Sequence, residues 1–326
     1  MKIKAAVIDQ LGQIPKFKEF DLPEILHENQ LLLQVKASAV KNLDKLRASG
    51  NHYASHKELP AIVGMDGVGL LEDGRRVYAK GISGMIGEKA IIDSRKMTLI
   101  PDDLDYSLAA ALPNAVLGAA MSIKIRGQIK EGQNVLINGA TGVTGQMAVQ
   151  IAKHYGAKTI ITTGRNQENL EKTKTLGATQ FISLKQDDES IKKQIQKIHQ
   201  ETPIDLVIDY LWGSPIELII DALEGSDLAT TAHQIRIVSV GSMAGNSINL
   251  DSETLRSSAI EIVGSGFGSL SEEDFDRYDQ EILPEMFELA ANGKLTMNLH
   301  EGKLEDIESL WEEKIDSGKR LVILMD

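Results

Sequence analysis

Residues 134–145 read Asn-Val-Leu-Ile-Asn-Gly-Ala-Thr-Gly-Val-Thr-Gly, and this stretch decides the fold. Its apolar start, Val135-Leu136-Ile137, is typical of a strand that is buried on both faces. Three glycines follow, and an amphipathic stretch that ends at Gly156 then predicts a helix. A strand, a glycine turn and a helix in this order let backbone N–H groups approach a pyrophosphate at a helix N-terminus. The stretch therefore predicts a dinucleotide site, and the alternative is a tight turn in an unrelated α/β protein.

Strand-like and helix-like segments alternate along the chain from about residue 114. The expected strands are residues 134–138, 159–163, 180–183, 206–209, 235–240 and 260–263. Helices are expected between most of them, at 166–176 and 189–200 among others. This alternation predicts an α/β fold with a doubly wound parallel Rossmann sheet.

The first 112 residues have a different pattern of short strands and turns. Strands are expected at 4–8, 30–37, 63–71, 76–78 and 88–92. Near the other end, a helix is expected at 272–292 and a strand at 320–324. We therefore expect the Rossmann domain, residues 119–267, to be inserted into a β-rich domain formed by residues 1–118 plus 268–326.

Composition excludes several classes of protein. The formal net charge of −12 argues against a nucleic-acid or anionic-membrane surface. The chain has no cysteine, which excludes disulfides and thiolate zinc sites, and its seven histidines lie in no metal-binding motif. No apolar run of about 18 residues was found. We expect a cytoplasmic protein that acts on a small molecule, without a metal, nucleic acid or membrane as partner.

The segment after the second expected strand indicates which dinucleotide binds. In NAD-binding sites an acidic residue at this point holds the ribose, whereas here Thr163 takes its place and Arg165 follows. An arginine attracts the extra phosphate of NADPH, so NADPH is expected; the alternative is a solvated Arg165 beside the helix cap Asn166. The residues expected to bind the cofactor are Gly139, Ala140, Thr141, Gly142, Val143, Thr144, Gly145, Thr163, Gly164, Arg165, Asn166, Val240, Gly241, Gly264 and Ser265.

Four further segments, at residues 37–44, 59–69, 73–77 and 318–322, occur in the order of motifs that one family shares. With the glycine turn, they resemble the zinc-free quinone oxidoreductase (zeta-crystallin-like) branch of the medium-chain dehydrogenase/reductase superfamily. The resemblance implies a GroES-like β-rich domain and hydride transfer from NADPH to a quinone or an α,β-unsaturated carbonyl compound. Met65-Asp66 stands where zinc-dependent relatives have a His-Glu pair, so no catalytic zinc is expected.

Without a metal, side chains, backbone groups or water must stabilise the oxyanion that forms during hydride transfer. The expected catalytic residues are Lys41, Tyr53 and Asn114. Each has a simpler alternative: Lys41 on the surface, Tyr53 packed on a ring, and Asn114 as a helix cap. Asp44 is expected to orient Lys41 or to cap a helix.

Three functions remain open from the sequence alone. The first is an NADPH-dependent reductase of quinones or enones, and the second is a metal-free alcohol dehydrogenase or ketoreductase. The third is an NADPH-binding redox sensor with little catalysis. The family default is a homodimer, which would form through the edge strand 260–263 of the Rossmann sheet unless a loop covers that edge.

Overall fold

The computed structural model describes residues 1–22, 24–25, 27–224 and 233–325. It divides into two compact units. One comprises Met1–Asn114 and Asp276–Asp326, and the other comprises Ala115–Phe275. The expected domain boundaries, after residues 118 and 267, lie a few residues from these divisions.

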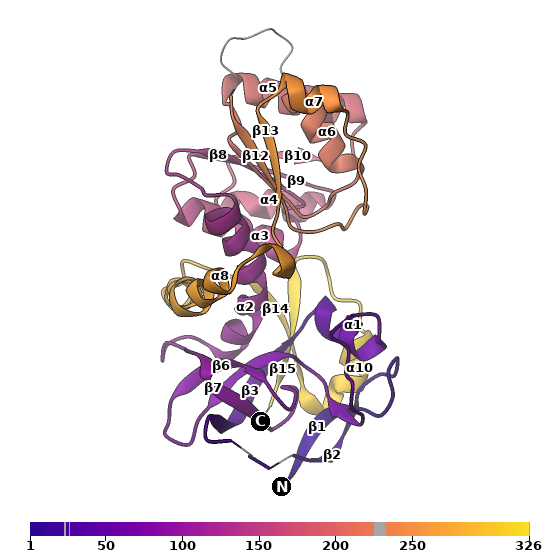
Figure 1. Ribbon diagram of the computed structural model, residues 1–326, viewed down its shortest axis with the longest axis vertical. Helices are drawn as coiled ribbons and strands as arrows, with labels where there is room; N and C mark the ends of the chain where they lie inside the picture. Colours follow the sequence, from indigo (N-terminus) through magenta and orange to yellow (C-terminus); the bar gives the residue numbers. More distant parts are fainter. Residues whose placement is uncertain (23, 26, 225–232, 326) are drawn as a thin grey trace. The chain divides into compact units, whose positions relative to one another are not determined.

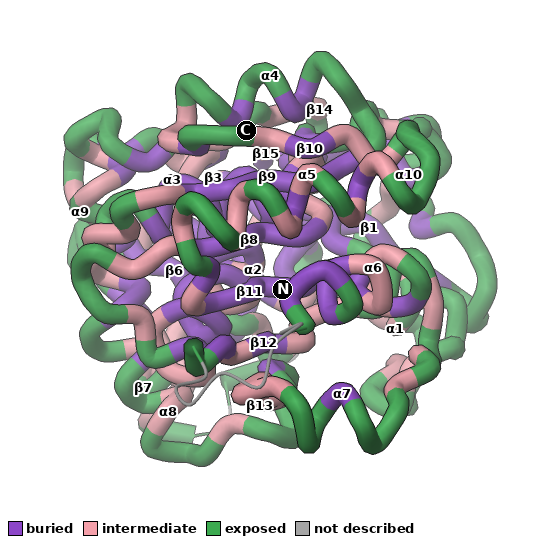
Figure 2. The backbone as a smooth tube through the Cα atoms, turned by 90° about the horizontal axis from the view of Figure 1, so that it is seen from above, coloured by how far each residue is buried: buried purple, intermediate pink, exposed green. Residues whose placement is uncertain are grey.

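The second unit is built on a parallel six-stranded sheet with the order β10-β9-β8-β11-β12-β13 (Figure 1). Its strands are β8 (Asn134–Asn138), β9 (Thr159–Gly164), β10 (Gln180–Ser183), β11 (Leu206–Asp209), β12 (Ile235–Ser239) and β13 (Ile260–Gly264). The expected strands and the doubly wound sheet are thus confirmed. Figure 2 shows the burial of the central strands β8 and β11, whose apolar residues are covered on both faces.

Helices connect these strands. They are α3 (Val143–His154), α4 (Gln167–Leu176), α5 (Asp188–Glu201), α6 (Ser214–Leu223) and α7 (Ser252–Ser257). The contacts pair α3 with α4 and α5 with α6. Leu136 and Ile161 of the sheet share a core with Ile195 of α5 and Ile219 of α6.

Local sequence sets where these helices begin and end. Asn166 caps α4, because its side chain accepts a hydrogen bond from the backbone N–H of Asn169. Asp187 caps α5 in the same way through Ser190. Gly177, at φ +129°, ends α4. The helix expected at 166–176 is therefore confirmed, with Asn166 as its N-cap.

The first unit is rich in β-structure. A six-stranded sheet has the order β14-β15-β3-β5-β6-β7, and β7 also pairs with β3, so that four strands close into a ring. A second sheet has the order β2-β1-β4. The strands are β1 (Lys2–Ile8), β2 (Lys16–Asp21), β3 (Gln30–Val40), β4 (Ala61–Ile62), β5 (Asp66–Leu70), β6 (Arg76–Gly81), β7 (Lys89–Leu99), β14 (Asn298–Lys303) and β15 (Lys319–Leu324).

Some expected elements in the first unit were wrong in detail. The strand expected at 63–71 is shortened to β5, because Gly64 at φ +90° turns the chain between β4 and β5 and packs on Ile86. The helix expected at 272–292 consists of α8 (Glu272–Arg277), a π-helical turn and α9 (Leu283–Ala291). The short helix α1 (Asn42–Ser49) and the strand β2 were not expected, and β14 and α10 (Ile307–Glu312) precede β15.

One helical stretch is long and apolar, although the sequence contains no uninterrupted apolar run of about 18 residues. Tyr106–Arg126 consists of α2 (Tyr106–Ala120) and a π-helical segment, Met121–Arg126, and by length and composition it could cross a membrane. In its most apolar window, 67% of the residues are buried inside the protein. Such burial is what a core helix of a globular protein shows.

Candidate active site

The glycine turn follows β8 at the carboxyl edge of the parallel sheet. The strand order reverses there, because β9 lies on one side of β8 and β11 lies on the other. In open α/β sheets, ligands bind beside the carboxyl ends of the strands at such a reversal. The turn therefore occupies the position at which a dinucleotide site is expected.

The three glycines of the turn have different surroundings. Gly139 has φ +88°, which side chains rarely tolerate. A Cβ on Gly145 would lie 2.4 Å from the carbonyl oxygen of Gly139, so this glycine lets α3 pack on the turn. A Cβ on Gly142 would be 4.0 Å from the carbonyl oxygen of Gly139, an ordinary contact distance, so the protein itself leaves room for a side chain there.

Gly142 is also the N-cap of α3, and it has no side chain that could cap the helix. The first N–H groups of a helix have no partner within it, and they carry part of the positive end of the helix dipole. Because Gly142 has no side chain, an anion can approach the first N–H groups of α3. The turn fits the pyrophosphate of a dinucleotide, and residues 139–145 would hold it.

A buried polar network beneath the turn joins three strand ends. Asn138 donates from Nδ2 to Asp209 Oδ1 over 2.7 Å, and Thr163 Oγ1 donates to Asn138 Oδ1 over 2.5 Å. Asp209 also accepts the backbone N–H groups of Leu211 and Trp212. Burial raises the pKa of Asp209, although these hydrogen bonds act in the opposite direction. The network fixes the ends of β8, β9 and β11 relative to one another.

The network also determines what Thr163 can do. Its side chain is fully buried, and its hydroxyl binds Asn138 and accepts the backbone N–H of Gly139 over 3.3 Å. It therefore holds the turn in place. Arg165, by contrast, is exposed directly after β9. Of these two residues, Arg165 is the one whose side chain is free to extend toward a phosphate.

The remaining expected cofactor residues lie at the same edge of the sheet. The backbone N–H of Val240 donates to Asp209 O, and that of Ser265 donates to Ser239 O. A Cβ on Gly241 would lie 2.8 Å from Tyr210 O, so the backbone passes close to β11 at this point. The structure thus brings together at one edge the cofactor-binding residues expected from the ends of β8, β9, β12 and β13.

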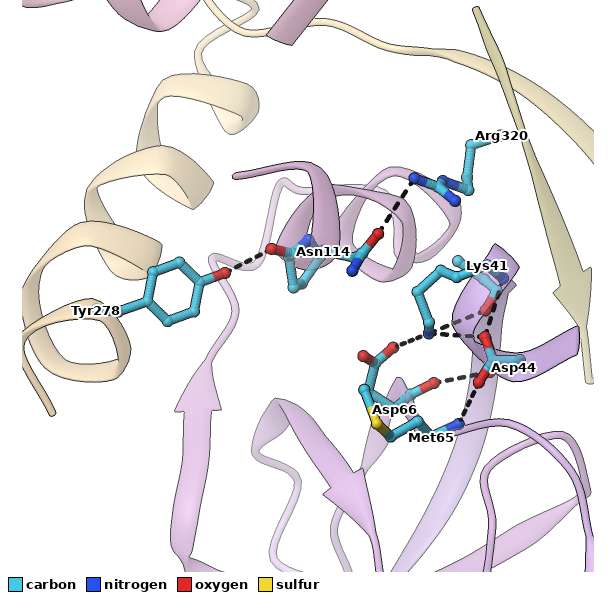
Figure 3. A network of polar contacts seen from close by, with 10 residues as sticks. Lys41, Asp44, Met65, Asp66, Asn114, Tyr278 and Arg320 are labelled. Carbon is cyan, nitrogen blue, oxygen red and sulfur yellow. Dashed lines mark hydrogen bonds and ion pairs between the residues drawn. The ribbon is translucent and has the colours of Figure 1, made fainter. Parts of the chain in front are cut away.

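A second polar cluster lies in the first unit, around Lys41 (Figure 3). Lys41 is only 2% exposed. Its ammonium lies 2.6 Å from Asp66 Oδ1 and 3.3 Å from Asp44 Oδ2, and it also donates to Ala39 O over 3.1 Å. Burial acts to lower the pKa of Lys41, but the two carboxylates outweigh it, and the pKa is raised. Lys41 therefore remains charged in the folded protein.

Both carboxylates in this cluster are held from more than one side. Asp44 accepts the backbone N–H of Lys41 at the start of α1 and the backbone N–H of Met65, each over 2.9 Å. The expectation that Asp44 orients Lys41 or caps a helix is confirmed on both counts. Asp66 also has a hydrogen bond to the buried Tyr78, and burial raises the pKa of that phenol well above its usual value.

Asn114 and Arg320 lie beside this cluster. Arg320 donates from Nη2 to Asn114 Oδ1 over 3.4 Å, as Figure 3 shows. Asn114 lies in α2 next to Pro113, whose carbonyl accepts the hydroxyl of Tyr278 over 2.6 Å. Asn114 is therefore inside a helix, and its alternative role as a helix cap is wrong.

Tyr53 is placed elsewhere in the same unit. Its side chain is 84% exposed and packs on the ring of His52, with ring centroids 4.2 Å apart. Tyr53 lines a cavity of about 650 Å³, together with Arg47 and His56. Lys41 and Asn114 do not line that cavity. The structure thus brings Lys41 close to Asp44 and Asp66, but Tyr53 is not part of this cluster.

Solved structures with the same fold include two quinone oxidoreductases. The mycobacterial enzyme gives a TM-score of 0.81 at 19% identity and covers 99% of this chain and 100% of its own. The enzyme from Coxiella burnetii gives 0.74 at 24% identity and covers the whole of both chains. At these identities the likeness concerns the fold alone.

Sequence comparisons give relatives of the same kind. The profile of the zinc-binding dehydrogenase family matches residues 143–283. The human quinone oxidoreductase is 27% identical over 282 residues, which cover 80% of this chain and 82% of that protein. An NADPH-dependent alkenal/one oxidoreductase from Arabidopsis thaliana is 31% identical over 201 residues. That match covers 54% of this chain and about half of the relative, 51%.

Over most of its length the chain is similar in sequence to quinone oxidoreductases, and its fold is that of solved quinone oxidoreductases. The resemblance found in the sequence motifs is thereby confirmed, as are the Rossmann sheet and the β-rich unit formed by both ends of the chain.

Because the matching family is that of zinc-binding dehydrogenases, we tested whether the side chains of this chain fit a zinc ion. The chain has no cysteine, and the carboxylates of Asp44 and Asp66 are already bound to the Lys41 ammonium. Within the described ranges, no group of three or more His, Cys, Asp and Glu side chains is placed to hold a metal ion. These side chains therefore do not fit a zinc ion.

Sequence reasoning missed three residues of these clusters. Asn138 was assigned only to the strand, and Arg320 only to the closing motif. Asp66 was noted as a replacement for a metal ligand, without a role. A buried lysine needs an acidic partner, but the sequence alone does not show that Lys41 is buried, so it held no clear signal for Asp66 or Arg320.

Proposed function

We propose that this protein is a zinc-independent oxidoreductase that uses NADPH to reduce a quinone or an α,β-unsaturated carbonyl compound. The observation that carries the proposal is the uncapped N-terminus of α3 at Gly142, open to a pyrophosphate at the sheet's strand reversal. The names of the human and Arabidopsis relatives support the choice of acceptor.

The residues of this chain would perform three tasks. Residues 139–145 would bind the pyrophosphate, and Arg165 would bind the additional phosphate of NADPH. The bound NADPH supplies a hydride. The buried carboxylates Asp44 and Asp66 fix the charged Lys41 in place, and this cluster provides the fixed charges near which an oxyanion is stabilised.

A panel of acceptors tests this function. Wild-type protein with NADPH is expected to reduce menadione or phenanthrenequinone, or an enone such as methyl vinyl ketone, faster than the simple ketone cyclohexanone. The reason is that a conjugated acceptor spreads the developing charge, whereas an isolated carbonyl needs stronger polarisation. Preferential turnover of cyclohexanone would favour the ketoreductase. Tight NADPH binding with no turnover of any acceptor would favour the redox sensor.

Replacement of Arg165 by alanine tests the choice of NADPH. One charge-assisted contact of about 1.5–3 kcal/mol would be lost. The Kd for NADPH should therefore rise by about 10- to 100-fold, whereas that for NADH should stay unchanged. Isothermal titration with both cofactors measures this, with Lys193→Ala, which removes an exposed positive charge from α5, as control. Equal losses for NADPH and NADH would contradict the assignment.

We also propose a homodimer that forms through β13. This strand is at the edge of the sheet, and its residues Ile260 to Val263 are only partly buried. An unpaired strand edge can pair with a second copy about a two-fold axis. Light scattering coupled to size-exclusion chromatography tests this, and a monomer at micromolar concentration would contradict it.

A further inference from the structure

With the neighbouring Arg320 included, the charges around Lys41 are balanced, but the two cations differ in how many hydrogen-bond partners they have. Lys41 and Arg320 supply two positive charges, and Asp44 and Asp66 supply two negative ones. An ammonium has three donors, and the ammonium of Lys41 has Ala39 O, Asp44 and Asp66 as partners. To bind a substrate oxygen, Lys41 would have to give up one of these partners.

Arg320 is in the opposite situation. Its Nε atom is buried and has no hydrogen-bond partner among the described residues. Its hydrogen bond to Asn114 is long, at 3.4 Å. A buried donor without a partner costs about 1–3 kcal/mol. Native structures contain few of them, and a ligand that is bound only during function is one physical reason to retain one.

The sheet register explains how Arg320 comes to lie there. Val40 of β3 pairs with Leu321 of β15, so the end of β3 that leads into Lys41 lies beside Arg320. Figure 3 shows the guanidinium beyond Lys41, extending toward Asn114 in α2. Arg320 therefore adjoins both Lys41 and Asn114, two of the residues expected to be catalytic from the sequence.

We propose that Arg320 is the residue that binds the carbonyl oxygen of the substrate and stabilises the negative charge that forms on it. Lys41 is then a positioning residue, which holds Asp44 and Asp66 beside the guanidinium. This inference rests on the proposed reductase function and deepens it, because it assigns the group that replaces a metal as electrophile.

The chemistry balances with this assignment. In an enone, the hydride brings an electron pair to the β-carbon while NADPH is oxidised to NADP⁺. The electrons of the C=C bond shift toward the carbonyl, and the pair of the C=O bond moves onto oxygen to give an enolate. Arg320 remains protonated and donates N–H bonds to this oxygen. Because an arginine does not release its proton, water supplies the proton to the α-carbon, and the C=O bond forms again.

Two variants at Arg320 and one at its neighbour test the proposal. Lys319 directly precedes Arg320 in β15, but its side chain is exposed and forms an ion pair with Asp316. Arg320→Met and Lys319→Met therefore remove the same charge and introduce the same side chain, one inside the cluster and one outside it. Arg320→Lys keeps the charge within the cluster and serves if Arg320→Met fails to fold, because the shorter lysine lacks the planar fork of donors.

Steady-state kinetics with menadione and methyl vinyl ketone at saturating NADPH, and titration of NADPH itself, give the readout. Loss of an oxyanion donor typically costs about 10²–10³ in kcat. We expect kcat to fall by about a hundredfold in both Arg320 variants, with little change in KM or in the Kd for NADPH. Lys319→Met should match the wild type in all three constants.

The outcomes separate this proposal from the function on which it rests. If folded Arg320→Lys retains the kcat of the wild type, the assignment of Arg320 is overturned while the reductase function stands. If kcat and NADPH binding fall together, Arg320 has a structural role and the assignment is again overturned. If the wild type reduces neither acceptor, the proposed function itself fails, and the inference falls with it.

Discussion

Gly142→Val is expected to remove tight NADPH binding while leaving the protein folded. A valine Cβ at this position meets no atom of the protein closer than 4.0 Å, and φ is an ordinary −81°. The side chain would instead fill the space in which a pyrophosphate meets the first N–H groups of α3. Loss of one or two charge-assisted hydrogen bonds, each of about 1.5–3 kcal/mol, weakens binding by on the order of a hundredfold.

Gly268→Val is the matched control, because a Cβ there also meets no atom within 4 Å. It should leave NADPH binding unchanged. Fluorescence titration of NADPH gives the affinities, and a thermal melt shows whether each variant is folded. Wild-type affinity in folded Gly142→Val would contradict the placement of the pyrophosphate at this turn.

Lys41→Met is expected to lower the free energy of unfolding strongly. It would leave the buried carboxylates of Asp44 and Asp66 with Arg320 as their only cation in the cluster. Removal of one partner from a buried ion pair costs about 3–5 kcal/mol. Urea unfolding should show this loss in the transition of the first unit.

The double variant Lys41→Met/Asp66→Asn is the control, because it removes one charge of each sign. It should recover part of the lost free energy of unfolding. Unchanged stability in Lys41→Met would contradict the network.

The sign of the pH dependence in the wild type follows from the raised pKa of Lys41. A group whose pKa is higher in the folded state contributes stability that is fully present below its unfolded value, which is 10.5 for lysine. That contribution is lost as the pH rises through the folded value. The wild type should therefore lose the contribution only in the alkaline range, and Lys41→Met should not show this loss.

Much of the second unit could be predicted because its signals are local in the sequence. The Val135-Leu136-Ile137 run, the glycine spacing and the cap at Asn166 each act within a few residues of the element they specify. These signals placed the strands of the parallel sheet and the start of α4. The strand expected at 63–71 shows the limit: it begins only at Asp66, because the turn at Gly64 depends on contact with the distant Ile86.

The polar clusters could be predicted only in part, because their partners are far apart in the sequence. Lys41 meets Asp66 across 25 positions, and Arg320 meets Asn114 across 206. A single sequence shows that Lys41 and Asn114 are unusual residues, but it does not show which charges surround them. Thr163 was likewise selected for its position after the strand, whereas its hydroxyl points inward to Asn138.

Deuterium transfer from the nicotinamide shows whether this protein carries out a direct hydride transfer. Wild-type protein is incubated with methyl vinyl ketone and NADPH that carries deuterium at C4 of the nicotinamide, prepared separately in each stereochemical form. We predict that one form transfers deuterium to the β-carbon of the product, as read by mass spectrometry and NMR, and that the other form does not. Product formed without deuterium from either form, or no product from any enone or quinone tested, would contradict a direct hydride transfer by this protein.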